Sequence, residues 1–276
     1  MIRRLGLAAG LALLAALPAP ARQAAPSATA PVEQAPKKLP GYLGPDGVPD
    51  ASKFLPPAPA DGSATEQRDF AVFMETRKLE GTDRWALAAR DAVQTPAAVL
   101  ADFDCALGVK LDPATAPALV RLLSRTGADA GAIVNRVKGL YKRPRPLVGN
   151  AQPICLERTD DLAKSPSYPS GHTTASWAWG LILAEIAPDR AEAVLARARA
   201  YGESRVVCGV HFVSDIDEGR ANGSALVAAE HANPEFRADL DAARAELAKL
   251  RAAGPAPDGA SCRIEDAAAA QTPWKG

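Results

Sequence analysis

Two of the three histidines in this 276-residue chain lie among other side chains that could do chemistry. His211 and Asp215 are four residues apart, so on a helix they would be separated by one turn. A carboxylate at that position can accept the imidazole N–H and fix the tautomer, which leaves the other ring nitrogen with a lone pair. The spacing therefore predicts an imidazole held in one tautomer, although an ordinary His–Asp pair on a helix surface has the same spacing.

The second histidine, His172, lies in segment 168–173, directly before an apolar stripe of helical spacing. The stripe consists of Trp179, Ile182, Leu183 and Ile186. Segment 168–173 is therefore expected at a helix N-terminus, where backbone N–H groups without partners attract an anion. Simple N-capping by Ser170, with Gly171 easing the turn, would explain the same residues. The third histidine, His231, is interpreted as a capping or surface residue at a helix C-terminus.

Basic residues end two other apolar stripes. Arg205 follows Val194, Ala198 and Tyr201 at offsets 0, 4, 7 and 11, so all four share one helix face. A guanidinium there must reach water or meet an anion, because burying it unpaired is costly. Gly209 is the expected chain break that would let Arg205 and His211 converge, since on an unbroken helix they would lie about 240° apart.

The same spacing recurs upstream of a proline-rich segment. Val134, Lys138, Tyr141 and Arg145 again follow offsets 0, 4, 7 and 11. Pro144 and the proline after Arg145 are expected to end the helix first, so Arg145 would enter from a loop. The alternative is that residues 142–146 form a solvated helix end with cations favoured by the helix dipole.

Helical periodicity dominates the rest of the chain. Phe70, Phe73 and Met74 have helical spacing, and strand-like alternation is nearly absent. We expect an all-α protein with a single compact helical domain over residues 62–253 and a C-terminal tail over residues 254–276. Residues 22–61 are rich in proline and alanine and are expected to form a flexible leader and an extended arm.

The N-terminus resembles an export signal. Residues 1–21 combine Arg3 and Arg4 with an apolar stretch and small residues before a cleavage position near Ala21, so the mature protein is expected to be periplasmic or secreted. Lys and Arg number 32 against 32 Asp and Glu, and cleavage would remove two arginines, leaving 30 against 32. This balance favours neither nucleic acid nor an anionic membrane surface as a partner. No stable membrane anchor is expected, and a homo-oligomer is a possible assembly.

An even number of cysteines in an exported protein predicts disulfides. The four cysteines are Cys105, Cys155, Cys208 and Cys262. Two disulfides can pair them in three ways, which the sequence does not separate. Because no C-x-x-C pair is present, a zinc site is not expected.

Together these segments follow the pattern K-x6-R-P, P-S-G-H and S-R-x5-H-x3-D, in that order. The eleven fixed positions are Lys138, Arg145, Pro146, Pro169, Ser170, Gly171, His172, Ser204, Arg205, His211 and Asp215. The arrangement resembles the type 2 phosphatidic acid phosphatase superfamily, and within it the secreted class A bacterial non-specific acid phosphatases. The likeness runs from about residue 41 to about residue 222. One departure is Pro166, where the class A signature has a glycine, and it is expected to alter the loop over the site.

The resemblance implies a helical-bundle acid phosphatase that hydrolyses small-molecule phosphate monoesters with no metal and no cofactor. His211 would be the nucleophile that becomes phosphohistidine, Asp215 would orient it, and His172 would be the general acid and then the general base. The residues that would bind the phosphate oxygens are Lys138, Arg145, Ser170, the N–H of Gly171, and Arg205.

Three other functions share part of this pattern. The related vanadate-dependent haloperoxidases build their vanadate site from the same residues. Lipid and isoprenyl-diphosphate phosphatases of the superfamily are usually integral membrane proteins, which the absence of apolar spans after residue 21 disfavours. An exported oxyanion-binding protein would need only the cations and the helix N-terminus, so it would leave both histidines and Asp215 unexplained.

Overall fold

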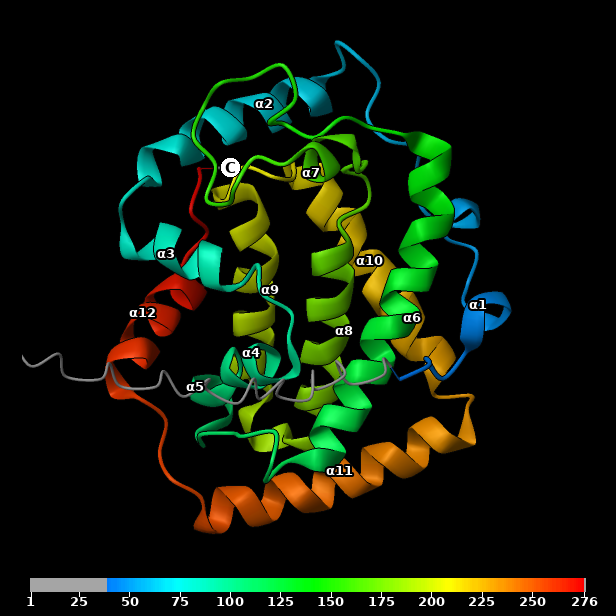
Figure 1. Cartoon of the computed structure of the whole chain (residues 1–276), viewed down its shortest axis with the longest axis vertical. Helices are drawn as coiled ribbons and strands as arrows, with labels where there is room; N and C mark the ends of the chain where they lie inside the picture. The colour runs from blue at the N-terminus through cyan, green and yellow to red at the C-terminus, as the bar shows by residue number, and fades with distance from the viewer. Residues whose placement is uncertain (1–38, 276) are drawn as a thin grey trace, which may run out of the picture. The chain divides into compact units, whose positions relative to one another are not determined.

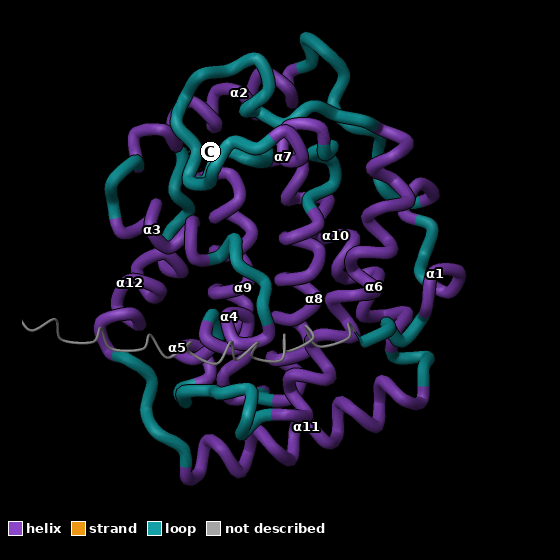
Figure 2. The backbone as a smooth tube through the Cα atoms, in the orientation of Figure 1, coloured by secondary structure: helices purple, strands orange, loops and turns teal. Residues whose placement is uncertain are grey.

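The computed structural model describes residues 39–275, which form helices joined by loops, with no strand among them (Figures 1 and 2). This confirms the predicted all-α class. The predicted signal peptide, residues 1–21, and residues 22–38 of the predicted leader lie outside the described residues.

Four long helices form the centre of the fold: α6 (Pro117–Tyr141), α8 (Gly171–Ile186), α9 (Ala191–Val207) and α10 (Val213–Glu230). Helix α8 packs against the other three. Short connections join α8 to α9 and α9 to α10, so successive helices run in opposite directions (Figure 1). The C-terminal ends of α6 and α9 therefore meet the N-terminal ends of α8 and α10 at one end of the bundle, drawn uppermost in Figure 1.

The main core surrounds α8, which is apolar on nearly all sides. Ile182 and Leu183 of α8 pack with Leu119 and Leu122 of α6 and with Tyr201 of α9, and all five are buried. A helix that is apolar around its whole circumference is stable only when other elements cover it. This explains why α8 lies at the centre.

Smaller elements surround the four helices. They are α1 (Gly44–Gly47), η1 (Ala51–Lys53), α2 (Ala64–Thr76), η2 (Arg77–Leu79), α3 (Asp83–Arg90), α4 (Pro96–Ala101), α5 (Asp104–Leu107), α7 (Asp160–Lys164), η3 (Pro188–Arg190), α11 (Pro234–Ala253) and α12 (Gly259–Ala270). Helix α11 packs across the lower end of α6 and α8, and α2 contacts α9 and α10 at the upper end (Figure 1). Among residues 39–275, no helix has both the length and the apolar character that crossing a membrane requires.

Helix α2 is rotated relative to the predicted stripe. Only Phe73 of that stripe is buried, whereas Phe70 and Met74 are exposed. The buried face carries Asp69 instead, which accepts hydrogen bonds from Arg143 and Ser214. Polar contacts to a distant loop thus decide which face of α2 turns inward.

The C-terminal tail, residues 254–276, contains α12, a helix that the sequence analysis did not identify. This helix packs on α9 and α3, and its stripe is built mainly from alanine, with Ile264 as its one large apolar residue. Small side chains give a weak periodic signal, which is why the helix was not predicted.

The two disulfides join Cys105 to Cys262 and Cys155 to Cys208, which selects one of the three pairings. The first ties α12 to α5. The second ties the loop after α6 to the turn that follows α9, and the Cys155 N–H also donates to the Cys208 carbonyl at 3.0 Å. This second disulfide lies three residues before His211.

Candidate active site

The end of the bundle where α6, α8, α9 and α10 meet brings the predicted site residues together. Lys138 is in the last turn of α6, Arg145 follows in a loop, His172 is in the first turn of α8, and Arg205 is in the last turn of α9. His211 lies between α9 and α10. Sequence segments more than 60 residues apart thus converge because the helices alternate in direction.

The chain break that allows this convergence is at Gly209. Its φ of +79° is in the left-handed region that favours glycine, and a Cβ there would lie 2.5 Å from Nη1 of Arg77. Arg77 donates to the carbonyls of Val206 and Val207 and so caps the end of α9. The predicted break between Arg205 and His211 is confirmed.

His211 is 1% exposed and is held at both ring nitrogens. Nδ1 lies 3.2 Å from Oδ2 of Asp215, and Nε2 lies 3.0 Å from Nη1 of Arg145. A guanidinium can only donate, so Nε2 must be the acceptor and Nδ1 must carry the proton that Asp215 accepts. The site therefore contains a neutral imidazole whose Nε2 lone pair points toward the cationic groups.

The electrostatics of the site favour this neutral form. Burial, together with the charges of Arg145 and Lys138, holds the pKa of His211 well below its usual value. Burial raises the pKa of Asp215, while the Arg143 guanidinium and the Phe212 N–H counteract that rise. Asp215 can therefore accept a hydrogen bond from Nδ1 of His211 while Arg143 and the Phe212 N–H donate to the same carboxylate.

Arg143 is a site residue that the sequence analysis did not single out. Its Nη1 donates to Oδ1 of Asp215 at 2.7 Å and to Oγ of Ser214 at 2.8 Å, and its Nη2 donates to Oδ2 of Asp69 at 2.8 Å. Arg143 and Arg145 are each 8% exposed, so these two arginines are not part of a solvated helix end, whereas Lys142 is exposed at the C-cap of α6. The two prolines hold the chain extended, which is the signal that could have placed Arg143 and Arg145 in the interior.

Lys138 and Arg145 are both bound by a short segment, residues 165–167. Nζ of Lys138 donates to the Pro166 carbonyl at 2.6 Å, and Nε of Arg145 donates to the Ser165 carbonyl at 2.8 Å. Burial lowers the pKa of Lys138 to about 8 and that of Arg145 to about 10. The charge of Arg145 lowers the pKa of Lys138 further, and the charge of Arg205 lowers the pKa of both. Pro166, the departure from the class A signature, thus directly contacts Lys138, which is predicted to bind the phosphate.

Arg205 has donors that no protein group satisfies. It is 2% exposed, and its Nε and Nη1 are buried with no hydrogen-bond partner among the described residues. Burial lowers its pKa to about 10, so the side chain is still charged near neutral pH. A buried, charged and unpartnered guanidinium is costly unless an anion completes it. This is the strongest mark of an anion site in the protein.

The N-terminus of α8 completes the arrangement. Ser170 is the N-cap, its Oγ accepting from the Thr173 N–H at 3.3 Å, as the capping alternative required. Its own N–H donates to the Asp215 carbonyl at 2.9 Å, which joins the starts of α8 and α10. Gly171 is the first residue of this 16-residue helix, at the end where backbone dipoles favour an anion.

His172 is half-buried, and its Nε2 lies 3.2 Å from the Ala92 carbonyl. Burial and the charge of Arg205 hold its pKa well below the usual value, and the Ala92 carbonyl opposes that shift. His231 lies apart from the site as a partly exposed C-cap of α10, 3.1 Å from Glu185. Within residues 39–275, no group of three or more His, Cys, Asp or Glu side chains is placed to hold a metal ion.

Comparison with known proteins places this site in a family. A family model described as the PAP2 superfamily matches residues 118–237, which include every residue of the pattern from Lys138 to Asp215. An acid phosphatase of Zymomonas mobilis is 43% identical over 220 residues, 79% of this chain and 83% of that protein. A non-specific acid phosphatase of Providencia stuartii is 39% identical over 204 residues, 73% of this chain and 82% of that protein. A non-specific acid phosphatase of Salmonella typhimurium is 34% identical over 199 residues, 70% of this chain and 78% of that protein. The resemblance expected from the motifs is confirmed, and the chain belongs to the PAP2 superfamily, within the group of the bacterial non-specific acid phosphatases.

Proposed function

We propose that the protein is an exported acid phosphatase that hydrolyses small-molecule phosphate monoesters without a metal ion, through a phosphohistidine at His211. The observation that carries this proposal is the pairing of a neutral, buried His211, whose Nε2 points at Arg145, with the unpartnered buried donors of Arg205. The names of the relatives support the activity. The apolar N-terminal segment and the paired cysteines support export to an oxidising compartment.

In the first step, the phosphate oxygens of the substrate bind Lys138, Arg145 and Arg205, with Ser170 and the Gly171 N–H completing the cradle. Nε2 of His211 attacks phosphorus, the bond from phosphorus to the ester oxygen breaks, and His172 gives its proton to the departing alkoxide. The imidazole gains positive charge as the P–N bond forms. Asp215 stabilises that charge through the Nδ1–H bond.

In the second step, His172 takes a proton from water, and the resulting hydroxide attacks phosphorus. The P–N bond breaks, inorganic phosphate is released, and both histidines return to their starting protonation states. Phosphoryl transfer depends chiefly on positioning and on neutralising the oxygens. Three cationic side chains supply that charge here, and arginines add two-pronged contact.

The pH dependence of kcat is expected to be bell-shaped on the acid side of neutral. His211 must be neutral to attack, and because its pKa is depressed, activity is lost only when pH falls well below about 6.5. His172 must be protonated to act as the acid. Burial and the charge of Arg205 lower its pKa, and a bound phosphate anion opposes that shift. Activity therefore falls as pH rises through the pKa of His172 in the substrate complex. A profile of kcat against pH checks this, and a plateau reaching about pH 9 would contradict the assignment.

Pro166→Gly is expected to weaken substrate binding. The fixed φ of Pro166 holds the carbonyl that positions Lys138, and glycine would release about 0.4–1 kcal/mol of backbone entropy, which corresponds to a KM roughly two- to five-fold higher. Because Lys138 contacts phosphate before and during the reaction, kcat should change little. Pro188→Gly, at the other end of the bundle in η3, is the matched control. An unaltered KM would show that Pro166 does not position Lys138.

The activity itself is tested by p-nitrophenyl phosphate hydrolysis at about pH 5–6 with EDTA present, with and without vanadate. Rapid, EDTA-resistant and vanadate-sensitive release is expected, because vanadate resembles the five-coordinate transition state. No release would contradict the proposal. Peroxide-dependent halide oxidation after vanadate loading would instead identify a haloperoxidase.

A further inference from the structure

The hydrogen bond between the His172 ring and the Ala92 carbonyl determines how the ring proton is placed. Nε2 lies 3.2 Å from the Ala92 carbonyl, which can only accept, so Nε2 carries a proton and Nδ1 is the nitrogen left for exchange with substrate. Ala92 lies in the turn after α3, where its N–H donates to the Ala89 carbonyl at 3.2 Å. The position of this turn therefore sets the tautomer and orientation of His172.

Asp91, the residue before Ala92, fixes this turn to the centre of the protein. Asp91 is fully buried and is the C-cap of α3. Its Oδ2 accepts from Oγ of Ser204 at 2.6 Å and from Nη1 of Arg197 at 3.2 Å, and its Oδ1 accepts from Nη2 of Arg197 at 2.7 Å. Ser204 is the neighbour of Arg205 in α9, so Asp91 links the turn that holds His172 to the helix end that carries the unpartnered cation.

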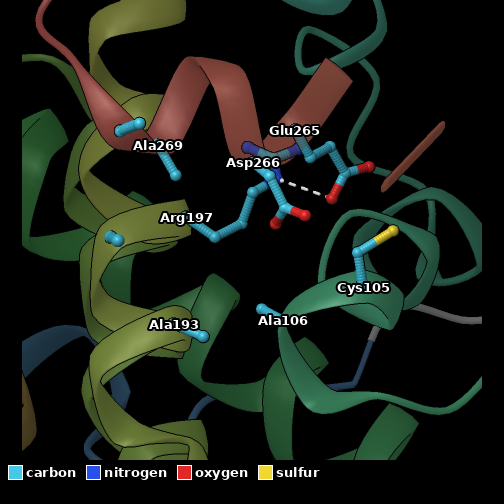
Figure 3. Close-up of a pocket in the computed structure, with 9 residues that line it drawn as sticks. Cys105, Ala106, Ala193, Arg197, Glu265, Asp266 and Ala269 are labelled. Carbon is cyan, nitrogen blue, oxygen red and sulfur yellow. Dashed lines mark hydrogen bonds and ion pairs between the residues drawn. The ribbon is translucent and has the colours of Figure 1, made fainter. Parts of the chain in front are cut away.

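Arg197 is in turn held from the far side by α12. Its Nε donates to Oε2 of Glu265 at 3.3 Å, as Figure 3 shows, and its Nη2 lies 3.5 Å from Oδ1 of Asp102. A pocket of about 220 Å³ lies here among α5, α9 and α12 and is lined in part by Cys105, Arg197 and Glu265 (Figure 3). Arg197 is 2% exposed, so its ion pairs with Asp91 and Glu265 are shielded from solvent.

We propose that Asp91 is a positioning residue for His172: through its buried bonds to Ser204 and Arg197 it holds the Ala92 carbonyl against Nε2 and so presents Nδ1 to the leaving group. This inference rests on the acid–base role proposed above for His172. Asp91 does not touch the substrate. Its loss should therefore act on proton transfer to the leaving group rather than on nucleophilic attack or phosphate binding.

The test compares two substrates in wild-type protein, Asp91→Asn and Asp91→Ala. The alkoxide of glycerol 2-phosphate needs a proton to depart, whereas p-nitrophenolate needs little help. Because kcat/KM reports the steps up to phosphohistidine formation, Asp91→Ala should lower kcat/KM about ten-fold or more further for the alkyl than for the aryl ester. Asp91→Asn keeps an acceptor for Ser204 and should lie between Asp91→Ala and the wild type.

Two controls separate this inference from the function beneath it. His172→Ala should show the same selective loss on the alkyl ester; if it does not, the acid role of His172 is wrong. If His172→Ala is selective, but folded Asp91 variants lower kcat/KM equally for both esters or for neither, the positioning role of Asp91 is wrong.

Asp129→Asn is the matched variant. Asp129 is also a buried carboxylate, but it binds the Tyr42 and Leu43 N–H groups, so its substitution should lower kcat/KM for neither ester selectively. If Asp91→Ala does not fold, Ser204→Ala removes the hydroxyl that donates to Asp91, and because that hydroxyl also accepts from Nη1 of Arg84 at 2.8 Å, Arg84→Ala is measured beside it. A selective loss in Ser204→Ala that Arg84→Ala lacks is expected, and no selective loss in folded Ser204→Ala would contradict the positioning role.

A second measurement does not depend on turnover. With three histidines in the chain, ¹⁵N NMR can identify the ring signals of His172 by their loss in His172→Gln. The wild-type protein should show His172 protonated at Nε2 in its neutral form, and Asp91→Ala should reduce that population. An unchanged tautomer in the folded variant would overturn the proposal.

Discussion

His211→Ala is expected to abolish turnover while the protein stays folded. The substitution removes Nε2, which lies 3.0 Å from Nη1 of Arg145 and whose lone pair would form the bond to phosphorus. Loss of a nucleophile typically costs on the order of 10⁴-fold or more in kcat. The side chain is small relative to the core, and Asp215 keeps its bonds to Arg143 and the Phe212 N–H.

The measurement is steady-state hydrolysis of p-nitrophenyl phosphate together with circular dichroism and thermal unfolding. His231→Ala is the matched control, since that partly exposed histidine pairs with Glu185 away from the site and should leave kcat unchanged. Retained activity in a folded His211→Ala protein would show that another group attacks phosphorus.

Arg205→Ala is expected to lower kcat/KM by about 10³-fold or more, in line with the effect of removing a charged donor from a phosphoryl-transfer site. The reason is that Nε and Nη1 of Arg205 have no hydrogen-bond partner within residues 39–275, which leaves them for the phosphate oxygens. Removing a buried, unpartnered cation should at the same time raise the free energy of unfolding or leave it unchanged, because its burial is uncompensated without ligand.

Kinetics, the inhibition constant of inorganic phosphate and thermal unfolding test this prediction together. Arg205→Lys keeps the charge but not the planar pair of donors, so its kcat/KM should lie between those of the wild type and Arg205→Ala. Arg251→Ala is the control, because it breaks a surface ion pair between Arg251 of α11 and Asp189 of η3, away from the site. A wild-type inhibition constant for phosphate in Arg205→Ala would contradict the assigned role.

Several features of the site follow from local sequence. The apolar face that carries Val194, Ala198 and Tyr201 is buried as expected and brings Arg205 inward. The break at Gly209 follows from the need for a positive φ, and the entry of Arg145 from a loop follows from its flanking prolines. Such features depend on neighbours within one or two turns, which is why a single sequence reveals them.

Other features depend on contacts between distant segments. Asp69 lies among polar residues of α2, and its burial is explained by its bonds to Arg143, 74 residues away, and to Ser214, 145 residues away. Asp91 looks like an ordinary helix-end carboxylate until α9 brings Arg197 against it. Helix α12 is joined to α5 by the Cys105–Cys262 disulfide and to α9 by the bond between Glu265 and Arg197. Local periodicity carries no signal for these pairings.

The most direct test of the account is to trap the phosphoenzyme. Protein mixed with ³²P-labelled substrate in EDTA is quenched in alkali, digested and mapped by mass spectrometry. The account predicts an acid-labile, alkali-stable phosphoryl group on His211 that is absent from His211→Ala. Phosphate found on a serine or carboxylate, or turnover with no covalent intermediate, would contradict it.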